Sequence, residues 1–215
     1  ISSSTSVVIS TVAGNVNAIG YISLGSLNDT VKAIKVDGVE ASVENIKAGK
    51  YPVVRSFNLV TGSELSDLAK DFITFIMSKE GQEIVGGEGY ISNIENPAEY
   101  VKQNGLTGRI VLAGSTSVAP VMEVLADAYK EMYSGVEIEI QQTGSGAGIT
   151  STIEGACDIG MASRDLKDEE IAKGVEQTQM ALDGIAVIVN TENSVEDLST
   201  EQIRSIFTGE TTTWE

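Results

Sequence analysis

Short apolar runs alternate with longer stretches of helical period along the whole chain. The first is an apolar run at 6–13, and residues 18–22 have the composition of a short buried strand. Residues 31–36 alternate apolar and polar side chains and then meet the Asp-Gly pair at 37–38, a pair typical of a tight hairpin turn. Residues 57–61 are a further candidate strand.

The next pattern predicts a strong amphipathic helix. Apolar side chains between 65 and 76 recur at helical spacing, with Ser63 or Ser66 as the candidate N-cap, and the pattern continues as far as Val85. Residues 86–108 are polar and rich in Gly and Asn, which favours a linker.

From Arg109 onward, strands, turns and helices follow one another. The predicted strands are 110–113, 136–140, 158–162 and 185–189. The predicted helices are 118–132, a second that opens at the glycine-rich turn 144–148 and ends near 155, and a third at 198–207, with Ser199 and Gln202 in capping-box spacing. Strands that alternate with helices predict an α/β fold with a largely parallel sheet.

Composition and charge exclude several classes of function. The 215 residues suffice for one large domain or two small ones, and the formal net charge of −17 would repel a nucleic-acid backbone. No apolar run approaches about 18 residues, the length of a membrane-spanning helix, and no signal peptide is visible. Histidine is absent, which excludes His-based triads and His metal ligands. Cys157 is the only cysteine, so no intramolecular disulfide can form.

Three turns share one design: an apolar strand, a loop of Gly and Ser or Thr, and the start of a helix. They are 114–117, 144–148 and 162–165. Turns of this kind lie at the carboxyl ends of parallel strands, where open α/β sheets bind ligands. Helix N-termini and hydroxyl groups together form an anion cradle without net positive charge. Each turn taken alone is better explained by ordinary N-caps and turn glycines, and only the succession of three turns, one with an arginine, gives the anion cradle equal weight.

Arg164 is the only cation in these turns, and an arginine fork suits tetrahedral oxyanions. The alternative is a surface salt bridge to Asp165, Asp168 or Glu169. A dinucleotide site is disfavoured, because Ile149 stands where the fingerprint needs glycine. Cys157 has the setting of a core thiol. We therefore expect no catalytic residue, no metal site and no cofactor.

Several consecutive motifs carry a resemblance to a known family. They are AGSTSVAP at 113–120, QTGSGAGI at 142–149, DIGMASRD at 158–165, DGIAVIVN at 183–190, FTGETTTW at 207–214, NAIGYIS at 17–23, VDGV at 36–39, YPVVR at 51–55 and SKEGQ at 78–82. With them the chain resembles the extracytoplasmic phosphate-binding receptors of bacterial ABC importers. The resemblance implies a periplasmic-binding-protein-like type II fold, in which two α/β lobes flank a cleft. It also implies that inorganic phosphate and the membrane permease subunits are the partners, and that the protein is no enzyme.

The order of these motifs differs from the family pattern, which suggests a circular permutation. On this hypothesis residues 93–108 join the old C-terminus to the old N-terminus. The main lobe would then be 31–190, and 1–30 with 191–215 would form an incomplete second lobe. The family's Arg-x-Asp/Glu-Gly-Ser-Gly-Thr stretch is not found. We therefore expect that the chain is a fragment that binds phosphate weakly, with the missing N-terminal segment or a second chain as a further partner.

The resemblance also implies the ligand-binding residues and the location. Phosphate would be held by residues of all three turns: Ser115, Thr116, Ser117, Ser145, Ser163 and Arg164. Ser163 stands where some relatives carry a proton-accepting aspartate, and Asp165 is a candidate substitute. The protein would be secreted or anchored as a lipoprotein at the outer face of the cell membrane, or periplasmic where an outer membrane exists. A receptor for sulfate or molybdate, a phosphoester-processing enzyme and an adhesion or signalling protein stay open as alternatives.

Overall fold

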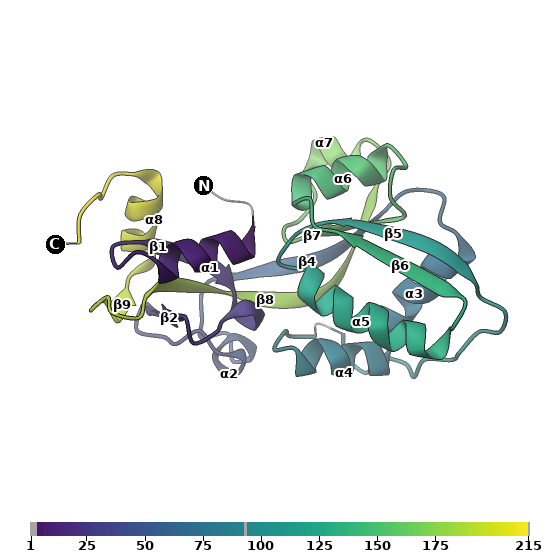
Figure 1. Ribbon diagram of the computed structural model, residues 1–215, viewed down its shortest axis with the longest axis horizontal. Coiled ribbons are helices and arrows are strands. Elements are labelled where there is room, and N and C mark those ends of the chain that lie inside the picture. Colours follow the sequence, from purple (N-terminus) through teal and green to yellow (C-terminus); the bar gives the residue numbers. More distant parts are fainter. Residues whose placement is uncertain (1–3, 93, 215) are drawn as a thin grey trace. The chain divides into compact units, whose positions relative to one another are not determined.

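The computed structural model describes residues 4–92 and 94–214, and the chain divides into two compact units (Figure 1). The first unit contains Ile1–Val54 and Asp183–Glu215, and the second contains Arg55–Leu182. Each unit has its own strands and helices.

The expected lobe 31–190 differs from the second unit at both of its ends. Strand pairing is the reason: β2 (Val31–Ala33) and β1 (Ile19–Ser23) both pair antiparallel with the last part of β8 (Glu176–Asn190). Residues 31–54 and 183–190 therefore group with the first unit. The assignment of ligand-binding lobes to these units stays a prediction.

The second unit is built on a mixed sheet whose parallel strands lie at one end. β5 (Gly108–Gly114) lies between β6 (Val136–Gln141) and β7 (Ile159–Ala162), and both neighbours run parallel to it. The next strand, β4 (Val54–Thr61), pairs antiparallel with β7. The expectation of a largely parallel sheet thus holds only for β7, β5 and β6, at one end of the sheet. α5 (Ala119–Met132) crosses over from β5 to β6, and α6 (Ser145–Ile153) crosses over from β6 to β7, whereas β4 enters from an earlier part of the chain.

Helices cover both faces of this sheet. α6 (Ser145–Ile153) and α7 (Asp168–Ile171) lie on one face (Figure 1). α3 (Asp67–Met77), α4 (Lys79–Gly87) and α5 (Ala119–Met132) lie on the other. The larger core lies under this second layer and is made of fully buried side chains such as Phe57, Phe72, Ile110, Leu112, Met122, Leu125 and Tyr129.

The expected helix at 65–85 is two helices. Ser66 is the cap of α3, because its Oγ accepts the Ala69 N–H at 3.1 Å. Ser78 ends α3 in an extended conformation, and its Oγ accepts the Gly81 N–H at the start of α4. A serine cap at this point lets the apolar pattern continue while the helix axis changes.

The polar segment 94–107 has no helix or strand, but it is held firmly against the helices. The Tyr100 N–H donates to Glu80 at 2.7 Å, and its hydroxyl donates to the buried carboxylate of Asp71 at 2.5 Å. Tyr129 of α5 donates to the same carboxylate oxygen at 2.6 Å. Residue 93 lies outside the described part of the expected linker, and the role of the linker in a permutation stays a prediction.

The first unit contains shorter elements. Besides β1, β2 and the end of β8, it contains α1 (Thr5–Ala13), η1 (Leu24–Ser26), β3 (Lys35–Val36), α2 (Val43–Lys47), β9 (Asp197–Leu198) and α8 (Thr200–Thr208). The hairpin turn is confirmed, since Asp37 and Gly38 have φ values of 52° and 76°. The capping box before α8 is confirmed as well: Ser199 accepts from the Gln202 N–H, and Gln202 accepts from the Ser199 N–H.

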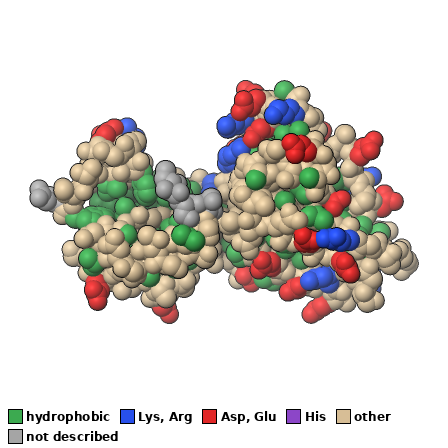
Figure 2. Space-filling model, turned by 45° about the horizontal axis from the view of Figure 1, so that its top comes forward, with side chains coloured by type: hydrophobic (Ala, Val, Ile, Leu, Met, Phe, Trp, Pro, Cys, Tyr) green, Lys and Arg blue, Asp and Glu red, His purple; other side chains and the backbone are tan. Residues whose placement is uncertain are grey.

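On the face of the molecule that Figure 2 shows, acidic side chains are scattered over the second unit, with basic ones among them. No helix among the described residues is long and apolar enough to cross a lipid bilayer.

Candidate functional site

The three glycine- and serine-rich turns meet at one edge of the second unit, where β5, β6 and β7 end. The Gly144 N–H donates to the Gly114 carbonyl at 2.7 Å, which joins the turn after β6 to the end of β5. The Ser115 N–H donates to the Met161 carbonyl at 2.8 Å, which joins the turn after β5 to β7. The three turns therefore lie together, as the alternation of strands and turns in the sequence predicted.

Close backbone packing brings α6 to this edge. A Cβ atom at Gly148 would lie 2.4 Å from the Ala113 carbonyl oxygen and 2.5 Å from the Gly114 Cα. A Cβ at Gly114, whose φ is +146°, would lie 2.1 Å from the Met161 carbonyl oxygen. Glycine is thus required where helix and strands touch, and the motif glycines serve packing as well as the turn.

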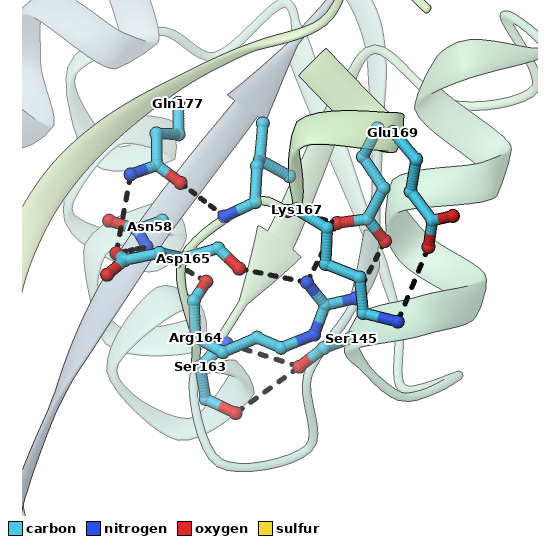
Figure 3. Close-up of polar contacts among 10 residues, drawn as sticks. Asn58, Ser145, Ser163, Arg164, Asp165, Lys167, Glu169 and Gln177 are labelled. Atoms are coloured by element: carbon cyan, nitrogen blue, oxygen red, sulfur yellow. Dashed lines mark hydrogen bonds and ion pairs between the residues drawn. The ribbon is translucent and has the colours of Figure 1, made fainter. Parts of the chain in front are cut away.

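Two serine hydroxyls from different turns contact each other. Ser145 is the first residue of α6, and Ser163 follows β7. The Ser163 N–H donates to Ser145 Oγ at 3.1 Å, and the two Oγ atoms lie 3.2 Å apart (Figure 3). Both side chains are partly exposed, so they remain accessible to a small ion.

The hydrogen bonds of Ser115, in the turn after β5, are formed mainly with other residues of the same turn. Ser115 is 2% exposed, and its Oγ accepts the Ser117 N–H at 3.2 Å. Its carbonyl accepts from the N–H groups of Val118 and Ala119. Thr116 and Ser117 are partly exposed at the point where α5 begins. Ser115 therefore shapes this turn, while the next two side chains reach the surface.

Arg164 lies in the third turn, but its guanidinium is directed at an acidic partner. It donates to both carboxylate oxygens of Glu170 at 2.8 and 2.7 Å, and to the Asp165 carbonyl at 2.9 Å. Hydrogen bonding from Arg164 lowers the pKa of Glu170 from 4.5 to about 2. The sequence favoured Asp165, Asp168 or Glu169 as partners. The ion pair is formed with Glu170 instead, because α7 places that side chain over the turn.

Asp165 is fixed by residues that the motifs did not indicate. One carboxylate oxygen, Oδ1, accepts from Ser56 at 2.6 Å, from Asn58 at 3.1 Å and from Gln177 at 3.3 Å (Figure 3). The hydrogen bond from Ser56, followed by that from Asn58, lowers the pKa of Asp165, so the carboxylate is ionised at neutral pH. The one feature of the sequence that could have indicated these partners is Asn58, a polar residue inside an apolar strand. In the structure its side chain is fully buried.

This edge of the sheet combines hydroxyl groups with the beginnings of two helices. α5 and α6 both begin here, so the positive ends of two helix dipoles lie beside the serine hydroxyls. Among the described residues, no group of three or more His, Cys, Asp and Glu side chains is arranged to hold a metal. Cys157 is buried, and burial raises the pKa of its thiol, as a core position predicts.

Comparison with known proteins places the chain in a family. A model of the PBP superfamily domain matches residues 101–215. The phosphate-binding protein PstS 2 of Streptococcus agalactiae serotype V is 50% identical over 216 residues, which cover 100% of this chain and 73% of that protein. The chain belongs to the PstS family. PstS 2 of Streptococcus pneumoniae serotype 4 is 47% identical over 215 residues, with the same coverage of 100% and 73%.

A solved PstS-family structure matches the fold. It is a phosphate-binding protein of a phosphate ABC transporter from Streptococcus pneumoniae TIGR4, 48% identical, with a TM-score of 0.78. The match covers 98% of this chain and 81% of that one, which confirms the periplasmic-binding-protein-like fold. The alignments with both PstS 2 proteins run through the whole chain, so these relatives share its order of segments. A permutation relative to other members of the family stays a prediction.

Proposed function

We propose that the chain binds inorganic phosphate outside the cytoplasmic membrane and delivers it to an ABC importer. Its PstS relatives are phosphate-binding proteins, and its second unit has a hydroxyl-rich edge at the ends of three parallel strands. The observation that carries the proposal is the contact between Ser145 and Ser163, because it brings two turns of the predicted cradle together.

The predicted site residues take different roles in this proposal. Ser145, Ser163, Thr116 and Ser117 present hydroxyl or amide donors to the ion, next to two helix N-termini. Ser115 is buried and shapes the first turn from within. Arg164 fixes the third turn through Glu170, and its charge acts on the ion at longer range.

Delivery requires only binding and release, so no bond in phosphate is broken. The permease subunits of the importer are the partners that this function requires. A location outside the cytoplasmic membrane follows from the same function, since such receptors collect the ion before transport. Secretion, or attachment to the outer face of the membrane through a lipid anchor, is part of the same proposal.

Phosphate titration followed by NMR tests the proposed site. Amide resonances of Ser145 and Ser163 should shift with saturation, even where binding is weak. Ser145→Ala should weaken binding about tenfold, because a charge-assisted hydrogen bond contributes about 1.5 kcal/mol. Ser151→Ala is the matched control, since Ser151 lies in the same helix away from Ser163. If neither amide shifts, or if the two variants bind phosphate equally, the proposed site is wrong.

A further inference from the structure

We propose that Asp165 is a positioning residue: its carboxylate holds the third turn, residues 162–165, in the conformation that presents Ser163 to the ion, and it does so without contacting the ion. The inference rests on the proposed function and adds to that site a residue that acts through Ser163. It follows from contacts that join Asp165 and its two neighbours in the chain to β4 and β8.

A single carboxylate oxygen of Asp165 accepts three hydrogen bonds. Its Oδ1 accepts from Ser56 Oγ at 2.6 Å and from Asn58 Nδ2 at 3.1 Å, both on β4, and from Gln177 Nε2 at 3.3 Å on β8. Figure 3 shows the carboxylate pointing toward these partners and away from the hydroxyl of Ser163. The oxygen therefore joins the third turn to two strands at once.

The residues on either side of Asp165 are held by the same two amide side chains. Asn58 Nδ2 also donates to the Arg164 carbonyl at 2.9 Å, and the Leu166 N–H donates to Gln177 Oε1 at 2.6 Å. Three consecutive residues are thus bonded to β4 and β8. Because Ser163 directly precedes them in the chain, these contacts also restrict where its N–H and hydroxyl point.

The buried amide of Asn58 is accounted for by this contact. Asn58 is 0% exposed within the buried stretch 57–60 of β4, and it lies opposite Ala162, the last residue of β7. Burying an amide is costly unless it is hydrogen-bonded. Its Oδ1 has no partner among the described residues, whereas its Nδ2 donates to Arg164 and Asp165. The contribution of this amide is therefore its hydrogen bonds to the third turn.

The charge of Asp165 and its hydrogen bonds should act on phosphate binding in opposite directions. Hydrogen bonds from Ser56 and Asn58 lower the pKa of Asp165, so the group is charged at neutral pH and repels an anion nearby. Asparagine at this position keeps an acceptor oxygen and loses the charge, whereas alanine loses both. Asparagine and alanine variants therefore have the same charge and differ only in the hydrogen bonds.

Titration with inorganic phosphate at about pH 7, followed by the amide resonances of Ser145 and Ser163, compares the natural chain with Asp165→Asn and Asp165→Ala. Asp165→Asn should bind phosphate at least as tightly as the natural chain. Asp165→Ala should bind it at least about tenfold more weakly than Asp165→Asn, although the two have equal charge. Before phosphate is added, Asp165→Ala should move the Ser163 amide resonance further than Asp165→Asn does, since this amide donates to Ser145 Oγ. Asp165 is exposed, so both variants should fold.

Ser56→Ala supplies a second, independent comparison, because it removes the shortest of the three hydrogen bonds. It should weaken phosphate binding about threefold in the natural chain and have no effect in Asp165→Ala, where the acceptor is already gone. An equal effect in both backgrounds would overturn the inference. Equal phosphate binding by the asparagine and alanine variants, or a difference below about tenfold, would overturn it as well. Phosphate that shifts neither amide of the natural chain would overturn the proposed function itself.

Discussion

Gly148→Ala tests whether the close approach of α6 to β5 builds the site. The added Cβ would lie 2.4 Å from the Ala113 carbonyl oxygen and 2.5 Å from the Gly114 Cα, and both atoms belong to the backbone. Contacts below 3.0 Å are essentially never seen for a real Cβ, so the helix must move away from the strand. That movement would separate Ser145 from Ser163.

The expected loss of stability follows from two opposed effects. Overpacking of a tight interior costs about 1–3 kcal/mol, and replacing glycine by alanine within a helix gains up to about 1 kcal/mol. The net expectation is a loss of about 1–2 kcal/mol in the free energy of unfolding. Gly146→Ala is the matched control, because nothing lies within 4 Å of a Cβ there. This variant should gain about 0.5 kcal/mol.

Urea denaturation followed by circular dichroism measures both variants, with amide hydrogen exchange in α6 as the local probe. Tryptophan fluorescence is unsuitable, since the only tryptophan, Trp214, belongs to the first unit. The reasoning fails if Gly148→Ala is as stable as Gly146→Ala. It also fails if Gly148→Ala loses stability while α6 exchange and phosphate binding stay unchanged.

Two further predictions concern charges in the second unit. The Arg164 hydrogen bonds keep the pKa of Glu170 below its ordinary value, so their stabilisation is complete above pH 4.5 and is lost as the pH falls toward about 2. Glu170→Gln should therefore lower the free energy of unfolding by about 1–2 kcal/mol at pH 7, a value reduced for solvent screening. In urea titrations near pH 2, the difference in stability from the natural chain should vanish. A constant difference between pH 7 and pH 2 would contradict the prediction. Asp71→Asn should cost about 2–3 kcal/mol and expose the amide of Tyr100 to hydrogen exchange, because Asp71 accepts from the hydroxyls of Tyr100 and Tyr129 at 2.5 and 2.6 Å and from that of Tyr133 at 3.5 Å. Asp67→Asn, at an exposed pair with Lys70, should cost under about 0.5 kcal/mol, and equal losses in the two variants would refute the role of the buried carboxylate.

Much of the fold could be predicted because its elements carry local signals. The Asp-Gly turn, the Ser199 capping box and the strand–turn–helix units after Arg109 are all found where the pattern places them. α7 and α2 have only four and five residues, which is too short for a helical period to appear. β8 begins at Glu176, well before the predicted strand at 185–189. The first part of β8 is polar, so the apolar pattern did not indicate it.

The turns of the candidate site could be predicted, but their side-chain partners could not. Gly and Ser after an apolar strand are local features, and the parallel sheet brings them together. Ser56 and Asn58 contact Asp165 across more than a hundred residues of chain, so nothing near Asp165 indicates them. Arg164 lies in a turn that the sequence predicts to bind the ligand, yet its ion-pair partner is Glu170, which only the fold of α7 could place.

The most direct test of the central claim is a crystal structure of this chain grown in phosphate. The account predicts a tetrahedral ion within hydrogen-bond distance of Ser145 Oγ and Ser163, next to the turn that carries Thr116 and Ser117. An ion bound elsewhere in the second unit, or none at this edge at saturating phosphate, would contradict it.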